Sequence, residues 1–151
     1  PQSYIAEPEI INKLKRELSS FKKLSWDNSP DNFKALLESD ILISALSGIV
    51  FDYAFVFEKP VITVDLDYNF IGQEANDLPY DVWELTVLDE IGKRVKPEQL
   101  NNISSIIDEL LNNKAGKESI KRLRDKSLYN YKNCGGAIAN NLVKIMDDIE
   151  T

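Results

Sequence analysis

Residues 39–64 read SDILISALSGIVFDYAFVFEKPVITV and contain three apolar runs separated by turn-forming residues. The first run, Ile41 to Ala45, is short and bounded by polar residues, which predicts a strand buried on both faces. Ile49 to Phe57 is almost wholly apolar and is followed by Lys59-Pro60, which favours a buried helix, and Val61 to Val64 predicts a second buried strand. Strand, Ser-Gly turn, helix and strand form a βαβ unit. The sequence therefore predicts an α/β fold with a Rossmann-like parallel sheet and helices on both of its faces.

The sequence on either side of this unit predicts mainly helices and loops. Before it, a helix is expected at about 8–20, a strand-like step at 24–26, and a second helix up to residue 38, with Ser29 as its N-cap and Pro30 in its first turn. After it, residues 65–80 have no periodicity and predict a long loop, and residues 83–95 predict a mixed segment. Helical spacing then predicts a C-terminal helical extension, with helices at about 97–112, 117–131 and 136–149.

Composition excludes several classes of function. The chain has 151 residues, of which 43% are hydrophobic, and this suits one globular domain. Its net charge of -7 opposes binding to nucleic acid. The chain has one cysteine, Cys134, and no histidine, so it lacks a ligand set for a zinc ion and has no catalytic Ser-His or Cys-His pair. A single cysteine also fits a reducing, cytoplasmic setting. No run approaches about 18 apolar residues, so no membrane span is expected.

We expect residues 1–151 to be a single nucleotide-binding domain. Because the sequence begins at Pro1 rather than at methionine, with no leader, we expect it to be a piece of a longer two-domain protein. We expect no metal ion and no other cofactor.

Candidate ligand-binding residues follow the first strand of the βαβ unit. In an open parallel sheet, ligands lie beyond the carboxyl ends of the strands. Ser44, Ser47 and Gly48 occupy this position, where the first backbone amides of a helix can bind a phosphate group. The alternative is structural: Ser47 caps the helix, and Gly48 lets the helix pack close to the sheet.

Asp52 comes four residues after Gly48 and so shares one face of the predicted helix with it. A carboxylate in a buried helix needs a hydrogen-bonding or charged partner, because burying a lone charge costs roughly several kcal/mol. That partner is either a pair of ribose hydroxyls or a structural group such as a backbone amide or a lysine.

Two further pairs of residues are weaker candidates. Asp65 and Asp67 follow the second strand, where they either contact a diphosphate-bound Mg²⁺ or a substrate hydroxyl, or are solvated loop charges. Asn28 and Ser29 either recognise a base edge or are explained by turn and cap chemistry.

Four stretches of the chain together resemble the CDP-glycerol glycerophosphotransferase family. They are PQS at 1–3, WDNSP at 26–30, SDILISALSGIVFDYA at 39–54 and KPVI at 59–62. The resemblance spans most of the chain and is densest from 39 to 64. A looser resemblance to UDP-sugar epimerases and glycosyltransferases, which carry a similar Ser-Gly turn, keeps a sugar nucleotide open as the donor.

The resemblance implies the C-terminal, nucleotide-binding half of a transferase with the GT-B architecture. Such an enzyme transfers glycerol phosphate, or a related polyol phosphate or sugar, from a CDP-activated donor to a teichoic-acid-like or capsular polymer. Ser47 and Gly48 match the family's phosphate-facing turn, and Asp52 matches an acidic residue on the following helix. The implied partners are the donor nucleotide, the missing N-terminal domain and a lipid-linked polymer acceptor. The implied location is the cytoplasm, at the inner face of the cell membrane in the full-length protein.

The chain also departs from the family pattern. Ala45 stands where the family usually has aspartate, and the family's His-Pro histidine would fall immediately before Pro1. We therefore expect residues 1–151 alone to bind a donor without turning it over. The alternative is a non-catalytic nucleotide-binding or protein-interaction module of the same fold. A receiver-like signalling domain is disfavoured, because Ser44-Ala45 supplies no acid to an acidic cluster.

Overall fold

The predicted βαβ unit is present in the protein, whose computed structural model describes residues 7–66 and 79–149. Strand β1 (Leu42–Ser44) leads through a short turn into helix α4 (Ile49–Phe57), and strand β2 (Val61–Val64) follows. The two strands are parallel, with Leu42 opposite Val61 and Ser44 opposite Thr63. The apolar runs thus predicted both strands and the helix between them correctly.

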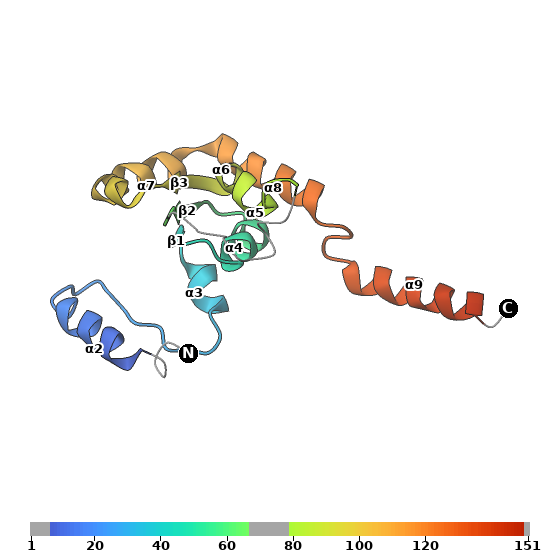
Figure 1. Cartoon of the computed structure of the whole chain (residues 1–151), viewed down its shortest axis with the longest axis horizontal. Helices are drawn as coiled ribbons and strands as arrows, with labels where there is room; N and C mark the ends of the chain where they lie inside the picture. The colour runs from blue at the N-terminus through green and yellow to red at the C-terminus, as the bar shows by residue number, and fades with distance from the viewer. Residues whose placement is uncertain (1–6, 67–78, 150–151) are drawn as a thin grey trace. The chain divides into compact units, whose positions relative to one another are not determined.

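A third strand, β3 (Gly92–Val95), completes the sheet. It runs parallel to β2, with Val64 opposite Val95, and the strand order is β1-β2-β3 (Figure 1). Two short helices, α5 (Trp83–Thr86) and α6 (Leu88–Ile91), precede it. The sequence predicted only a mixed segment here, because glycine, lysine and arginine have little preference for strands.

Helices flank this small sheet and continue beyond it. After β3 come a 3₁₀ helix, η2 (Pro97–Asn102), and the helices α7 (Ile103–Asn112), α8 (Lys114–Ser127) and α9 (Cys134–Ile149). The three predicted C-terminal helices are therefore confirmed, with changed limits. The first of them begins as a 3₁₀ turn at Pro97.

Contact between the sheet and α7 forms a buried apolar cluster of Ile62, Val95 and Ile106, with three further α7 residues packed against it: Ile103, Ile107 and Leu110. Helix α4 contacts β1 and β2 and buries Val50, Tyr53, Ala54 and Phe55. Strand β2 is buried as predicted. The prediction that β1 is buried on both faces is wrong, because the Ile43 side chain is 46% exposed. Among the described strands, β1 lies at the edge of the sheet and pairs only with β2.

The chain divides into two compact units, residues 1–39 and residues 40–151. The first contains helices α2 (Pro8–Glu17) and α3 (Phe33–Glu38). No strand forms at residues 24–26 in this described part of the unit. Nor does Ser29 cap a helix: its hydroxyl accepts a hydrogen bond from the Asp31 amide at 3.2 Å, and α3 begins only at Phe33. Whether the chain functions as one domain of a longer protein stays a prediction.

An ion pair joins the end of α4 to α8. Glu58, which follows α4 with a φ of 54°, accepts a hydrogen bond at 2.8 Å from Nη1 of Arg124, a residue with 8% of its surface exposed. The Arg124 guanidinium lies 4.4 Å from the ring centre of Tyr131, and the Tyr131 hydroxyl donates to the backbone oxygen of Phe55 at 3.1 Å. The hydrogen bond from Arg124 is the main reason why the pKa of Glu58 lies below its usual value, although partial burial opposes the shift.

Among the residues that the structure describes, no helix has both the length and the apolar content needed to cross a bilayer.

Gly92 leaves no room for a side chain between β2 and β3, and a substitution there tests this. A Cβ atom at this position would collide with the backbone oxygen of Val61, the residue paired with Gly92 across the two strands. We expect Gly92→Ala to lower the free energy of unfolding by at least about 3 kcal/mol, because the strands must separate to admit the methyl group. The control is Gly135→Ala in α9, where a Cβ meets nothing within 4 Å. Equal stability of the two variants in urea unfolding would contradict this account.

The Glu58–Arg124 pair predicts a specific dependence of stability on pH. Because the pKa of Glu58 is lower in the folded chain than its unperturbed value of 4.5, the pair stabilises the folded state at neutral pH. That contribution is lost as the pH falls below 4.5 and through the folded pKa. We expect Glu58→Gln to be less stable than the original chain at pH 7. We also expect it to lose less stability than the original chain when the pH is lowered below 4.5, as measured by urea unfolding above and below that pH. Glu118→Gln, at a side chain that is 72% exposed, should keep the original pH dependence.

Candidate functional site

The start of α4 is open to solvent. Ser47 and Gly48 are both exposed, Gly48 occupies the N-cap position, and no side chain caps the helix. A Cβ built on Gly48 would meet nothing within 4 Å. The structural alternative for these two residues is therefore wrong, since Ser47 is not a side-chain cap and Gly48 is not required for close packing.

Some of the amides that open α4 are already used by the turn itself. The Val50 amide donates to the Ser47 oxygen and the Phe51 amide to the Gly48 oxygen, both at 3.1 Å. Within the described part of the chain, the amides of Gly48 and Ile49 have no backbone acceptor. The predicted anion-binding surface is thus narrower than a whole helix turn, and it consists of these two amides.

Asp52 is exposed, so the expectation of a buried carboxylate in need of a partner is wrong. Its helix is buried on the side of Val50, Tyr53 and Ala54, while Gly48, Asp52 and Val56 lie on the solvent side. The sequence did not reveal this solvent-exposed side of the helix, because Val56 on it is apolar although its side chain is 55% exposed. The prediction that Gly48 and Asp52 share one face is confirmed.

Polar residues form a row across the carboxyl edge of the sheet. Ser44, Thr63 and Arg94 are opposite one another in the three strands, and opposed residues of parallel strands point to the same face. Two residues further along, the same face carries Asp65 after β2 and Lys96 after β3. This row, which we call the carboxyl-edge row, stands at the end of the sheet where ligands bind in open α/β folds.

Asp65 forms ion pairs with the two cations of the carboxyl-edge row, Arg94 and Lys96. Its carboxylate oxygen Oδ2 lies 3.2 Å from Nε of Arg94 and 3.2 Å from Nζ of Lys96, and its amide donates to the Val95 oxygen at 2.8 Å. Asp65 is only 9% exposed, so its interpretation as a solvated loop charge is wrong. Asp67 lies outside the described residues. Among the residues that the structure describes, no three or more His, Cys, Asp or Glu side chains form a group that could hold a metal ion.

Arg94 and Lys96 are the site residues that sequence reasoning missed. Each carries a positive charge at the carboxyl edge and pairs with Asp65. The one available signal was the pair of apolar residues Ile91 and Val95 on either side of Gly-Lys-Arg, which is too weak to predict a strand. Once β3 is recognised, the alternation of side chains separates Arg94 from Lys93, which pairs with Glu109 of α7 at 2.6 Å.

Asn28 and Ser29 lie in the unit formed by residues 1–39. The Ser29 amide donates to Oδ1 of Asp27 at 2.8 Å, as in an ordinary Asx turn. Their contact with a nucleotide base stays a prediction.

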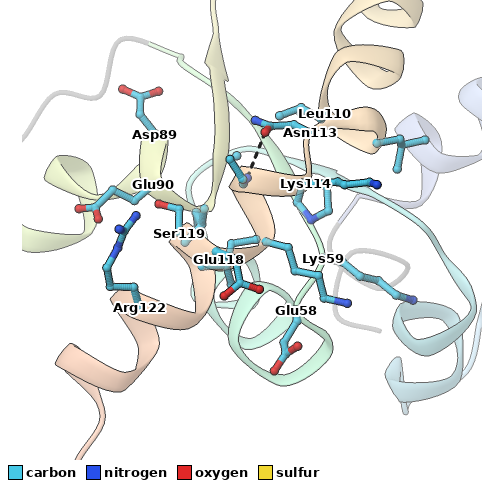
Figure 2. Close-up of a pocket in the computed structure, with 18 of the residues that line it drawn as sticks. Glu58, Lys59, Asp89, Glu90, Leu110, Asn113, Lys114, Glu118, Ser119 and Arg122 are labelled. Carbon is cyan, nitrogen blue, oxygen red and sulfur yellow. Dashed lines mark hydrogen bonds between the residues drawn. The ribbon is translucent and has the colours of Figure 1, made fainter.

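A cavity of about 730 Å³ lies at the opposite, amino end of the strands (Figure 2). Asp40, Pro60 and Gly92, which stand at the starts of the three strands, help to line it. At the nearby start of α8, the Gly116 amide is already engaged, because it donates to Oδ1 of Asn113 at 3.1 Å. Since ligands of open parallel sheets bind at the other end, we assign no ligand to this cavity.

Comparison of the chain with protein-family models, with curated proteins and with solved structures found no match. The chemistry of the carboxyl edge is therefore inferred from its own residues.

The burial of Asp65 between two cations gives a third prediction. Asp65→Asn removes the charge that Arg94 and Lys96 share, and we expect it to lower the free energy of unfolding by about 1–3 kcal/mol. Asp108→Asn, at an exposed residue of α7, should change stability by less than about 0.5 kcal/mol. Chemical denaturation of both variants at pH 7 measures the difference. A loss no greater in Asp65→Asn than in Asp108→Asn would show that the ion pairs contribute nothing.

Proposed function

We propose that the carboxyl edge of the sheet binds the diphosphate of a CDP-activated donor. The observation that carries this proposal is the open backbone at Gly48, where the amides of Gly48 and Ile49 have no backbone acceptor among the described residues and a Cβ would meet nothing within 4 Å. The positive charges of Arg94, on β3, and of Lys96, directly after β3, stand at the same edge. Two strand spacings, about 9–10 Å, separate β1 from β3.

In this proposal each residue has a distinct task. The Gly48 and Ile49 amides neutralise charge on one phosphate, while Arg94 and Lys96 neutralise the other. Asp65 keeps both cations at the edge and so positions them. A carboxylate engaged by two cations is poorly suited to taking a proton, and for this reason we assign Asp65 no role as a base.

The proposed reaction is transfer of a glycerol phosphate unit, or of a related polyol phosphate or sugar. For glycerol phosphate, an acceptor hydroxyl attacks the β-phosphorus, the bond from that phosphorus to the bridging oxygen breaks, and CMP leaves with the bridging oxygen. The described residues would orient the donor and stabilise charge on the departing phosphate. The base that accepts the hydroxyl proton would come from another part of the protein.

The wider setting is part of the same proposal. Residues 1–151 would be the C-terminal half of a GT-B transferase, completed by an N-terminal domain, and the acceptor would be a lipid-linked polymer at the inner face of the cell membrane. Its support is the resemblance of residues 39–64 to the glycerophosphotransferase family, together with the parallel βαβ unit that these residues form.

Ala45 favours a second candidate, a nucleotide-binding module without catalytic activity. It occupies the turn after β1, where the resembling family usually has an aspartate. Such a module would use the same carboxyl edge to bind the nucleotide but would have no acceptor reaction in the complete protein.

Titration of the chain with CMP, CDP-glycerol and a UDP-sugar, followed by amide chemical shifts, tests the proposal. We expect CDP-glycerol to shift the Gly48 and Ile49 amides and to bind more tightly than CMP, which lacks the second phosphate. Arg94→Gln and Lys96→Gln should each weaken binding about tenfold or more, whereas Lys93→Gln on the other face of β3 should not. Residues 1–151 alone should release no CMP from CDP-glycerol.

Each outcome of this titration has a clear meaning. Absence of shifts with every nucleotide would overturn the proposal, and so would equal effects of Lys93→Gln and Arg94→Gln. If the UDP-sugar binds more tightly than CDP-glycerol, the proposed binding site stands and the donor is a UDP-sugar instead of a CDP-activated compound. CMP release by these residues alone would contradict the proposal that the base lies elsewhere in the protein.

A further inference from the structure

A groove of about 590 Å³ follows the exposed side of α4, and we call it the α4 groove. Gly48, Asp52 and Val56 line it at intervals of one helix turn, so it extends along about 12 Å of the helix. Because Gly48 also carries the open backbone of the proposed phosphate site, the groove is continuous with that site. Its volume lies in the range of pockets that hold small organic molecules. The groove therefore has room for a further part of a ligand whose phosphate lies at Gly48.

Aromatic side chains contribute to the lining of the α4 groove. Trp83 of α5 lines it with 43% of its surface exposed, and the centre of its ring lies 5.3 Å from that of Phe51. The ring of Phe51 in turn lies 6.1 Å from that of Phe55, which also belongs to α4. The indole is thus held against a row of rings from the helix while part of it stays exposed. Nucleobases stack on exposed rings of this kind, because every base has a π-face.

Asp52 gives the α4 groove a hydrogen-bond acceptor one turn after Gly48. Its side chain is exposed, and the two carboxylate oxygens can accept hydrogen bonds from a pair of neighbouring hydroxyl groups. A negative charge at this place opposes the binding of a bare phosphate ion at Gly48. It suits a ligand that carries both a phosphate and a sugar, because hydrogen bonds from the sugar hydroxyls then offset the repulsion.

A nucleoside fits these observations better than a protein partner does. A peptide or helix that filled the α4 groove would also cover Gly48 and so close the phosphate site. A nucleoside that is bonded to a phosphate at Gly48 occupies the groove and leaves the phosphate site in use. It also supplies the two groups that the lining can recognise, a planar base for Trp83 and a ribose diol for Asp52.

We infer that the nucleoside of the donor lies in the α4 groove, with its base stacked on Trp83 and its ribose hydroxyls bound to Asp52. This inference rests on the proposed function, since a phosphate at Gly48 leads the nucleoside into the groove. It also orients the donor along the sheet edge. The phosphate bonded to the nucleoside lies at Gly48, and the phosphate that carries the transferred group lies at the cations of the carboxyl-edge row.

Three ligands separate this inference from the proposed function: CDP-glycerol, CMP and inorganic pyrophosphate. Pyrophosphate has the phosphates but no nucleoside, and CMP has the nucleoside but no glycerol. We expect all three to shift the Gly48 amide in NMR spectra of residues 1–151, whereas only the two nucleotides shift the indole N–H of Trp83. The loss of one indole signal in Trp83→Phe assigns that signal to Trp83.

Substitution of Trp83 tests the stacking contact. Trp83→Ala should weaken CDP-glycerol binding about tenfold or more and leave the pyrophosphate affinity unchanged, because only the nucleotide loses a stacked base. Trp83→Phe keeps a ring and should lose less affinity. The matched control is Tyr129→Ala, at an aromatic side chain that is 90% exposed and lies outside the groove lining, and it should keep both affinities. If circular dichroism shows that Trp83→Ala does not fold, the indole shift of the original chain decides.

Asp52→Asn tests the ribose contact. The substitution removes a charge that repels phosphate, so it should strengthen the binding of pyrophosphate. It should weaken the binding of CDP-glycerol several-fold, because an amide is a poorer acceptor than a carboxylate for the two ribose hydroxyls. Stronger binding of both ligands would show that Asp52 only repels phosphate, and it would overturn the contact with ribose.

The outcomes distinguish failure of this inference from failure of the proposed function. A shift of the Gly48 amide by CDP-glycerol with no shift of the Trp83 indole would overturn the inference and leave the proposed function standing. Equal losses of CDP-glycerol and pyrophosphate affinity in a folded Trp83→Ala chain would do the same. If no ligand shifts the Gly48 amide, the proposed function fails and the inference fails with it.

Discussion

The described unit of residues 40–151 depends on β2 being enclosed by a neighbouring strand on each side. Val61, Ile62 and Thr63 are each no more than 1% exposed, and their backbone groups pair with β1 on one side and β3 on the other. On the β3 side, Val61 pairs with Gly92, where a Cβ atom would collide with the Val61 backbone. The pairing of β2 with β1 and β3 makes the three strands parallel. It also places Ile62 and Val95 side by side, where they form the buried cluster with Ile106 of α7.

The two ends of the sheet are chemically different as a result. The amino ends lie beside a cavity whose helix start is already capped by Asn113, whereas the carboxyl ends present an uncapped helix start and two cations, Arg94 and Lys96, that pair with Asp65. A chain with a net charge of -7 thus concentrates two cations where its fold class binds ligands. These two cations add to the open backbone at Gly48, which is the main physical support for an anionic ligand.

The parts of the fold that could be predicted from sequence are those in which local pattern and tertiary position agree. Residues 41–64 form buried elements made of apolar residues, so their limits could be predicted closely. β3 could not be predicted, because its position follows from pairing with β2 and not from the preferences of Gly92, Lys93 and Arg94. The site was only partly predictable for the same reason: Gly48 lies next to the βαβ pattern, whereas Arg94 joins Asp65 only when the third strand is in place. Asp52 was misplaced because an apolar run does not reveal which side of a helix faces water.

The shortness of β1 has a consequence for the behaviour of the chain in concentrated solution. Within the described residues, β1 is an edge strand, and it exposes Ile43 beside backbone groups that a strand from another molecule could pair with. Open edges of this kind are a common origin of amyloid-like aggregation. With only three residues, however, β1 provides too few hydrogen bonds to recruit such a strand, and the brevity of the edge protects the chain from stacking into fibrils.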